Sequence, residues 1–228
     1  APLPNSPPIE YFDKAGNHLG LTADYFRIIE DKLDIRFQRV RCETWRDVLE
    51  KLRTREADLA GAVQNRPERR RFLDFTEPYL SIPNVIITRN DRPGTYRLDN
   101  MQGIRIAIVD RSATYEFLKE RHPEYRLVPV PNASTGFRMV SFMEVDAMVA
   151  DQGVASYYIE ELGITNLRIA GDIDYPWELC IATRSDWPML HSIMEKALAS
   201  IPRTQRGAIK RRWIRLLYIR PEQYLKIV

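Results

Sequence analysis

Apolar residues near the start of the chain follow a helical period and then change to a strand-like alternation. In the segment Thr22–Leu33, apolar side chains including Phe26 and Ile29 recur on one helical face. Ile35 and Phe37 then alternate with charged residues, as in a half-buried strand. The first unit is therefore predicted to be a helix followed by a strand.

The next helix carries its own start signal. Thr44 can cap it, and Asp47 lies three residues later in the capping-box position. Apolar residues follow with the spacing of one helical face: Trp45, Val48, Leu49 and Leu52. This pattern predicts an amphipathic helix that begins just after Thr44.

A short apolar run and a proline continue the alternation of strands and helices. Asp58–Val63 is apolar and bounded by charged residues, which is typical of a buried strand. Pro67 lies where proline favours the first turn of a helix, so we expect another helix there.

The same pattern restarts in the second part of the chain. A turn is predicted over residues 90–94, and Ile104–Val109 reads as a new strand, which places a lobe boundary near residue 90. The elements expected after it are a helix capped by Ser112, a strand at Leu127–Val130, a helix from Ser134, a strand at Val145–Ala150 and a helix closed by Gly163.

A second crossing between the lobes is predicted over residues 174–182, and a helix capped by Asp186 follows. Repeated strand–helix alternation favours an α/β fold of mostly parallel sheets flanked by helices, with a ligand cleft between two lobes. The predicted division is residues 1–88 for the first part of lobe 1, residues 89–176 for lobe 2, and residues 177–228 for the return crossing and the C-terminal helices of lobe 1.

The composition is typical of a globular protein and argues against a nucleic-acid-binding or membrane-spanning protein. The 228 residues are 44% hydrophobic, with 34 Lys and Arg against 31 Asp and Glu, and a net charge of +3 is too small for a general nucleic-acid-binding field. No apolar run is long enough for a membrane span. The residues after Ala1 do not resemble a signal peptide, so we expect any targeting segment to lie outside this sequence.

The stretch Arg203–Arg220 is basic, with seven positive charges and no acid. Trp213, Leu216 and Leu217 add an apolar stripe, so a core-packed helix with a solvated cationic face competes with a nucleic-acid or lipid contact, and we expect the former. Cys42 and Cys180 stand far apart, outside any metal-binding pattern, and are expected to be apolar fillers.

Known catalytic and cofactor motifs are missing from the sequence. It has no dinucleotide-binding or phosphate-loop glycine pattern, no nucleophile elbow and no zinc-protease motif, and its histidines are scattered. The expectation is a binding domain without catalytic residues, metal or cofactor.

One segment could bind an anion. Arg66, Pro67 and Arg69 directly follow the predicted strand Asp58–Val63, where a helix N-terminus and a guanidinium could together hold a carboxylate. An arginine in such a run can equally be a solvated surface charge.

Three further residues lie at element starts near the expected cleft. Ser112 and Asp151 follow strands at their carboxyl ends, where α/β proteins bind ligands, although helix capping alone explains both residue types. Trp45 could form a wall of the cleft or part of the core.

At this point the sequence resembles a known family along almost its whole length. The residues that carry the resemblance are Pro7–Asp13 with Gly16 and Gly20, Trp45–Leu52, Asp58–Ala62, Pro67–Arg69, Asp74–Tyr79, Gly103–Ala107 and Val145–Asp151. The series is similar to the periplasmic solute-binding proteins of family 3, the polar amino-acid type or Venus flytrap module. This resemblance implies a two-lobed, periplasmic-binding-protein-like (type II) α/β fold, although the first strand usual in the family is missing before Pro7.

The resemblance also assigns roles to residues of this chain. It implies that Arg69 binds the ligand carboxylate, Asp151 the ammonium group, and Ser112 caps the carboxylate from lobe 2, while Trp45 packs on the ligand. The other predicted ligand-binding positions, which depart from the commoner residues of the family, are Gln64, Ala62, Ala113, Arg66 and Arg111. The two additional arginines could favour a more anionic ligand or face solvent.

The segments Gly20–Glu30, Ala199–Pro202 and Ile209–Ile214 resemble versions of the family that are fused to transmembrane sensor kinases or cyclic-dinucleotide enzymes, and we expect the sensor histidine kinase type. The expected function is an extracytoplasmic, periplasmic sensing domain that binds an amino acid or related carboxylate. Its expected partner is the rest of a membrane-anchored receptor, which could form a dimer, and no nucleic-acid partner is expected. The alternatives are a free periplasmic binding protein of an amino-acid ABC transporter and, with less support, a periplasmic dehydratase or the effector domain of a transcription regulator.

Overall fold

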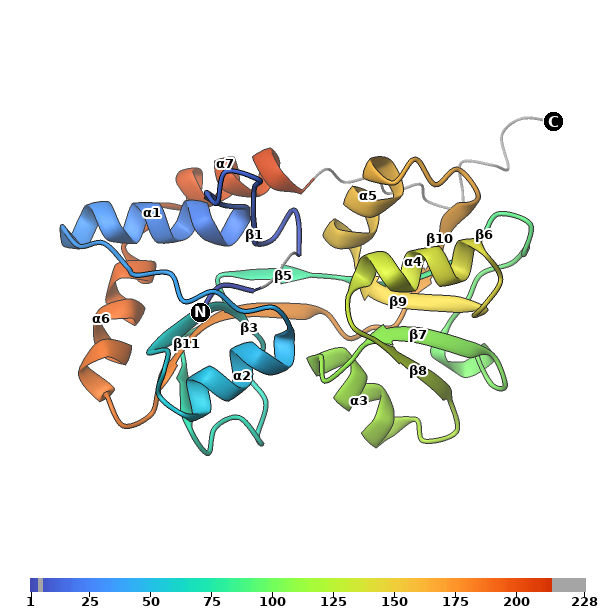
Figure 1. Cartoon of the computed structure of the whole chain (residues 1–228), viewed down its shortest axis with the longest axis horizontal. Helices are drawn as coiled ribbons and strands as arrows, with labels where there is room; N and C mark the ends of the chain where they lie inside the picture. The colour runs from blue at the N-terminus through green and yellow to red at the C-terminus, as the bar shows by residue number, and fades with distance from the viewer. Residues whose placement is uncertain (4–5, 215–228) are drawn as a thin grey trace.

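Two larger β-sheets, each covered by helices, form the two lobes of the protein, and a small two-stranded sheet belongs to the first lobe (Figure 1). The computed structural model describes residues 1–3 and 6–214. In the first lobe the sheet order is β3-β11-β4, with β5 also paired to β11, and in the second it is β10-β6-β9-β7-β8. The α/β class and the two-lobed architecture predicted from the sequence are confirmed.

The first lobe contains β1 (Tyr11–Phe12), β2 (His18–Leu19), α1 (Leu21–Leu33), α2 (Trp45–Arg53), β3 (Leu59–Val63), β4 (Leu73–Phe75), β5 (Leu80–Ile82), β11 (Trp177–Arg184), α6 (Pro188–Ala199) and α7 (Arg203–Trp213). The second lobe contains β6 (Asn84–Arg89), a 3-10 turn η1 (Leu98–Asn100), β7 (Arg105–Val109), α3 (Ala113–Arg121), β8 (Arg126–Val130), α4 (Ala133–Ser141), β9 (Ala147–Asp151), α5 (Gln152–Glu161) and β10 (Leu167–Asp172).

The expectation of mostly parallel sheets holds for only part of the second lobe. There β7 pairs in parallel with β8 and with β9, because α3 and α4 supply the crossover connections that parallel strands need. Every other pairing between the described strands is antiparallel. Both sheets are therefore mixed or antiparallel.

The chain passes between the lobes along extended segments. It leaves the first sheet at β5 and enters the second at β6, and β11 brings it back (Figure 1). The change of sheet falls between Ile82 and Asn84, so assigning residues 84–88 to lobe 1 was wrong. That segment is instead a central strand of lobe 2, paired on both sides with β10 and β9.

Three other local predictions were wrong. Residues 35–37 do not form a strand: the Phe37 N–H donates to the Glu30 carboxylate at 2.7 Å, and none of the described strands pairs with this segment. Residues 67–72 form successive turns rather than a helix. Asp186 does not cap α6, since its carboxylate pairs with Arg184 at 2.7 Å and Trp187 occupies the cap position.

Several helix starts agree with the sequence. The Thr44, Ser112 and Asp151 side chains each accept a hydrogen bond from a first-turn N–H of α2, α3 and α5. Side-chain caps of this kind contribute about 1 kcal/mol each. Because the strands β7 and β9 end directly at the last two caps, these polar side chains lie at the edge of the second sheet that faces the other lobe.

The C-terminal helix α7 packs on the first lobe. Ile209 is buried, and the Trp213 indole N–H donates to Asp24 of α1 at 2.6 Å. The core-packed interpretation therefore holds for residues 203–213, while Leu216, Leu217 and Arg220 lie outside the described residues. Among the described residues, no helix combines the length and apolar character needed to span a membrane. Both cysteines are free thiols.

Candidate functional site

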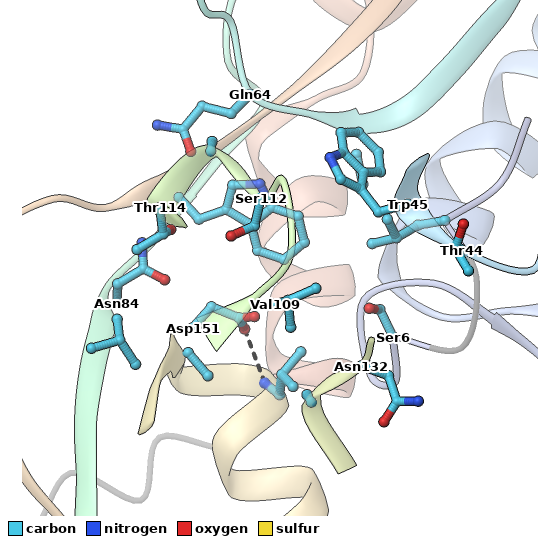
Figure 2. Close-up of a pocket in the computed structure, with 18 of the residues that line it drawn as sticks. Ser6, Thr44, Trp45, Gln64, Asn84, Val109, Ser112, Thr114, Asn132 and Asp151 are labelled. Carbon is cyan, nitrogen blue, oxygen red and sulfur yellow. Dashed lines mark hydrogen bonds between the residues drawn. The ribbon is translucent and has the colours of Figure 1, made fainter. Parts of the chain in front are cut away.

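A cavity of about 210 Å³ lies between the lobes and is lined from both of them (Figure 2). Trp45, Gln64 and Arg69 reach it from the first lobe, and Ser112 and Asp151 reach it from the second. Its volume is below the roughly 300 to 1,000 Å³ of sites for drug-sized molecules, so it is suited to a smaller ligand.

Arg69 supplies a buried positive charge to this cavity. Turns after β3 bring its side chain inward, where it is 4% exposed. Its guanidinium donates to the Gln64 carbonyl at 3.0 Å and to the Arg111 carbonyl at 3.4 Å, and it lies over the Trp45 ring at 5.3 Å. Burial lowers the pKa of Arg69 to about 10. None of the ion pairs found among the described residues includes Arg69, so its charge lacks a carboxylate partner there.

Asp151 supplies a buried acid to the same cavity. It is the last residue of β9, and its Oδ1 accepts the Val154 N–H of α5 at 2.9 Å. Burial raises the pKa of Asp151 to about 7, and the backbone hydrogen bonds only partly oppose this. Within residues 1–3 and 6–214, no cationic side chain pairs with it. A cation entering the cavity would stabilise the ionised form of this carboxyl group.

The backbone carbonyl of Arg111, in the second lobe, accepts hydrogen bonds from two side chains of the first lobe. It accepts the Trp45 indole N–H at 2.9 Å in addition to the long bond from Arg69. Arg111 has φ 54°, a left-handed conformation that is uncommon for a residue with a side chain. This turn after β7 presents a backbone acceptor to the other lobe.

Uncharged polar groups complete the buried part of the lining. Asn84 begins β6, and its amide group donates to the Thr114 hydroxyl at 3.1 Å and to the Tyr175 carbonyl at 2.7 Å. Gln64 Nε2 donates to the Pro176 carbonyl at 3.4 Å. Sequence reasoning missed Asn84 and Thr114, because their hydrogen bonds join parts of the chain that lie far apart in the sequence.

The structure brings most of the predicted site residues together. Those that line the cavity are Arg69, Asp151, Trp45, Gln64, Ser112, Ala62 and Ala113. Arg66 and Arg111 are not among the lining residues. The Arg66 guanidinium is instead held by Glu68 and Glu120, so it does not offer its charge to the cavity.

A second cavity of about 330 Å³ lies within the first lobe beside β3. Two of its ionisable lining residues already have acidic partners: His18 Nε2 lies 2.8 Å from Glu10, and Arg39 lies 2.8 Å from Glu30. Of these two cavities, the one between the lobes combines a buried cation and a buried acid that form no ion pair within the described residues.

This chain is similar to a known protein family and to the sensor protein BvgS. The family model of bacterial extracellular solute-binding proteins, family 3, matches residues 1–215. The virulence sensor protein BvgS of Bordetella pertussis is 34% identical over 195 residues, which are 85% of this chain and 16% of that protein. This chain therefore spans only a small part of that sensor protein.

A solved structure and a transport protein are also similar. The crystal structure of the BvgS periplasmic VFT2 domain of B. pertussis has a TM-score of 0.83 and 32% identity, covering 93% of this chain and 91% of that one. The ABC transporter arginine-binding protein 1 of Escherichia coli (strain K12) is 25% identical over 154 residues, covering 66% of this chain and 62% of that protein.

Proposed function

Since this chain belongs to family 3 of the bacterial extracellular solute-binding proteins, we propose that it binds a small amino acid or related carboxylate between its lobes. The observation that carries the proposal is the pair of buried, opposite and unpaired charges, Arg69 and Asp151, in one cavity of about 210 Å³. An α-amino acid carries a carboxylate for Arg69 and an ammonium group for Asp151, so it neutralises both.

The other lining residues would support this clamp. Trp45 provides an apolar face beside the guanidinium. The Ser112 Oγ accepts the Tyr115 N–H at 3.0 Å, which leaves its hydroxyl hydrogen to donate to a ligand carboxylate from the second lobe.

We further propose that the domain is a periplasmic sensing module of a membrane-anchored sensor kinase. The similarity to BvgS and to its VFT2 domain supports this assignment. In such a receptor, the ligand changes the populations of the open and closed lobe arrangements only if it binds one arrangement more tightly than the other. Kinase output and the membrane segment belong to the rest of such a receptor, and we assign no catalytic step to the cleft.

The binding proposal is tested by a thermal-shift screen of the purified domain against the twenty amino acids and small carboxylates, followed by calorimetry. A ligand at about 100 times its Kd stabilises a protein by about 2.7 kcal/mol. We expect Arg69→Ala and Asp151→Asn each to weaken binding by tens of fold or more, because each leaves one ligand charge without its buried partner. Unchanged affinity in both variants would overturn the clamp.

A transport role is the second candidate, because the chain is also similar to the ABC transporter arginine-binding protein 1. The two roles differ in the activity that ligand binding controls: a kinase in the sensor, and uptake through a permease in the transporter. Ligand-dependent autophosphorylation of the full-length protein in membranes supports the sensor, whereas ligand uptake that depends on this protein and a permease supports the transporter.

A further inference from the structure

The positive charge of the protein is concentrated on the last described helix. α7 carries five cationic side chains and no acid, whereas the whole chain has a net charge of only +3. The rest of the chain therefore carries a small net negative charge. Figure 1 shows α7 along the outer edge of the first lobe, beside α1, and neither cavity described above is lined by it. The helix thus presents an outer surface of the molecule rather than part of the cleft.

The inner side of α7 is occupied by contacts within the first lobe. Ile209 is buried there. Arg206 donates to the carbonyls of Leu198 at 2.6 Å and Ile201 at 3.0 Å, at the end of α6. Its charge therefore faces the negative end of the α6 dipole and is used within the fold. Because these contacts fix the orientation of α7, its opposite side faces solvent.

Three exposed cations of α7 form no ion pair within residues 1–3 and 6–214: Arg203, Lys210 and Arg211. The first two lie about two helical turns apart, so they are on the same side of the helix. A neighbouring cluster adds to this charge. Arg212 and Arg27 of α1 share the single carboxylate of Asp24, at 3.2 and 2.6 Å, so the three side chains together keep a net positive charge.

The composition of this surface favours a membrane over a protein as its partner. In the described structure, Ala208 is the only exposed apolar side chain of α7. Protein interfaces have an apolar or aromatic centre and are poor in lysine. An anionic membrane surface requires only positive charge held near its phosphate groups, and each Lys or Arg placed there strengthens binding by about five-fold. The domain is periplasmic, so nucleic acid is not the polyanion that it meets.

We propose that the outer side of α7, with Arg203, Lys210 and Arg211, docks the domain on the phosphate headgroups of an anionic bilayer. The inference goes beyond amino-acid binding, and it rests on the proposed membrane-anchored receptor only for the nearness of a membrane. Three such cations together should strengthen binding to anionic membranes by about 100-fold relative to neutral ones. Salt should weaken this binding, because the screening length falls from about 10 Å at 0.1 M to about 3 Å at 1 M.

The experiment measures co-sedimentation of the purified chain with vesicles of phosphatidylcholine alone and of equimolar phosphatidylcholine and phosphatidylglycerol. We expect strong binding only to the anionic vesicles, and the double variant Lys210→Gln, Arg211→Gln should weaken it by about ten-fold or more. The matched control is Arg121→Gln, Arg126→Gln, which removes the same charge from two exposed arginines of the second lobe that form no ion pair within the described residues. Equal binding to neutral vesicles, or equal losses in the two double variants, would overturn the docking surface.

Further measurements identify the source of the anion and separate this inference from the proposed function. Arg203→Gln alone should weaken vesicle binding by about five-fold, which checks the surface with an independent variant. Soluble glycerol phosphate at matched ionic strength should leave the bound fraction unchanged, and displacement would overturn the bilayer in favour of a small-anion site. If vesicles do not bind but ligand-dependent autophosphorylation occurs, this inference falls and the sensor stands. If vesicles bind as expected without such autophosphorylation, the docking surface stands and the sensor proposal falls.

Discussion

One guanidinium nitrogen of Arg66 lies 2.9 Å from both carboxylate oxygens of Glu120, and this ion pair joins the two lobes across the cleft. Arg66 follows β3 in the first lobe, and Glu120 lies on α3 in the second. The Arg66 side chain is only 8% exposed, so the pair is shielded on one side. Together with the Trp45–Arg111 hydrogen bond, it holds the lobes in the arrangement described here.

We expect Glu120→Gln to shift the domain toward a more open form. The variant keeps the shape of the side chain and removes the charge, which for a partly exposed pair is worth about 1 kcal/mol or about five-fold in the ratio of closed to open forms. Small-angle scattering should report a larger radius of gyration. Glu124→Gln is the matched control, because Glu124 contacts His122 within the second lobe. Identical scattering from both variants would show that the pair does not influence closure.

The raised pKa of Asp151 makes stability depend on pH in an unusual direction for an aspartate. Its pKa is about 7 in the folded protein against an ordinary value of 3.8, so the folded chain binds more protons than the unfolded chain between these values. The contribution of Asp151 to the free energy of unfolding is fully present below about pH 4 and is lost as the pH rises toward 7. Asp151→Asn should therefore gain stability relative to the wild type between pH 5 and pH 8, measured by urea denaturation. Parallel stability profiles would contradict this assignment.

Ligand binding should respond to the same group with the opposite sign. An ammonium group pairs with the ionised carboxylate, and the ionised fraction of a group with a pKa of about 7 rises about ten-fold between pH 6 and pH 8. We expect affinity for an amino acid to increase by about that factor, with protons released on binding near neutral pH. Calorimetry in buffers of different ionisation enthalpy measures that release. An affinity independent of pH would mean that Asp151 does not meet the ammonium group.

The parts of the site that could be predicted from the sequence are those fixed by local chemistry. Ser112 and Asp151 were recognisable because a cap at the end of a strand is a short-range pattern, and both do cap their helices. The partner of Arg66 was not recognisable, because Glu120 lies 54 residues away, on a helix of the other lobe. A neighbouring pattern was misleading, since Pro67 favours a first helical turn while residues 67–72 form successive turns.

Asn84 illustrates a different limit of sequence reasoning. Its amide hydrogen bonds link α3 to the segment that leads into β11, so its role depends on three separate parts of the chain. No local period or motif carries that information. The resemblance to a family assigned roles to Arg69 and Asp151 but assigned none to Asn84.

Asp24 anchors the C-terminal helix to the first lobe, and its removal should loosen that contact. It is 7% exposed and accepts from the Trp213 indole at 2.6 Å and from Arg212 at 3.2 Å. Hydrogen bonds to a charged group contribute about 1.5 to 3 kcal/mol, so Asp24→Ala should lower the free energy of unfolding by about 2 kcal/mol. Arg27→Ala removes a half-exposed partner of Asp24 and should cost less than 1 kcal/mol. Equal losses in the two variants would contradict the role of the Trp213 contact.

The absence of a side chain at Gly61 allows β3 to approach α1 closely. This packing therefore fixes the position of β3, the strand that precedes the cavity residues Gln64 and Arg69. A Cβ at this position would lie 2.3 Å from Phe26 Cε2 and 2.4 Å from Thr22 Cγ2. Both contacts come from buried side chains, so Gly61→Ala must move the strand or the helix, and we expect a loss of about 1 to 3 kcal/mol in chemical denaturation.

Gly207→Ala is the matched control for that change, because its Cβ would meet only the Arg211 side chain at 3.3 Å within α7. Alanine favours the helix there, so this variant should be neutral or up to about 1 kcal/mol more stable than the wild type. If Gly61→Ala is also neutral, the close packing of β3 against α1 is not what holds the strand. If it is destabilising and also weakens ligand binding, the position of Gln64 and Arg69 at the end of β3 depends on that packing.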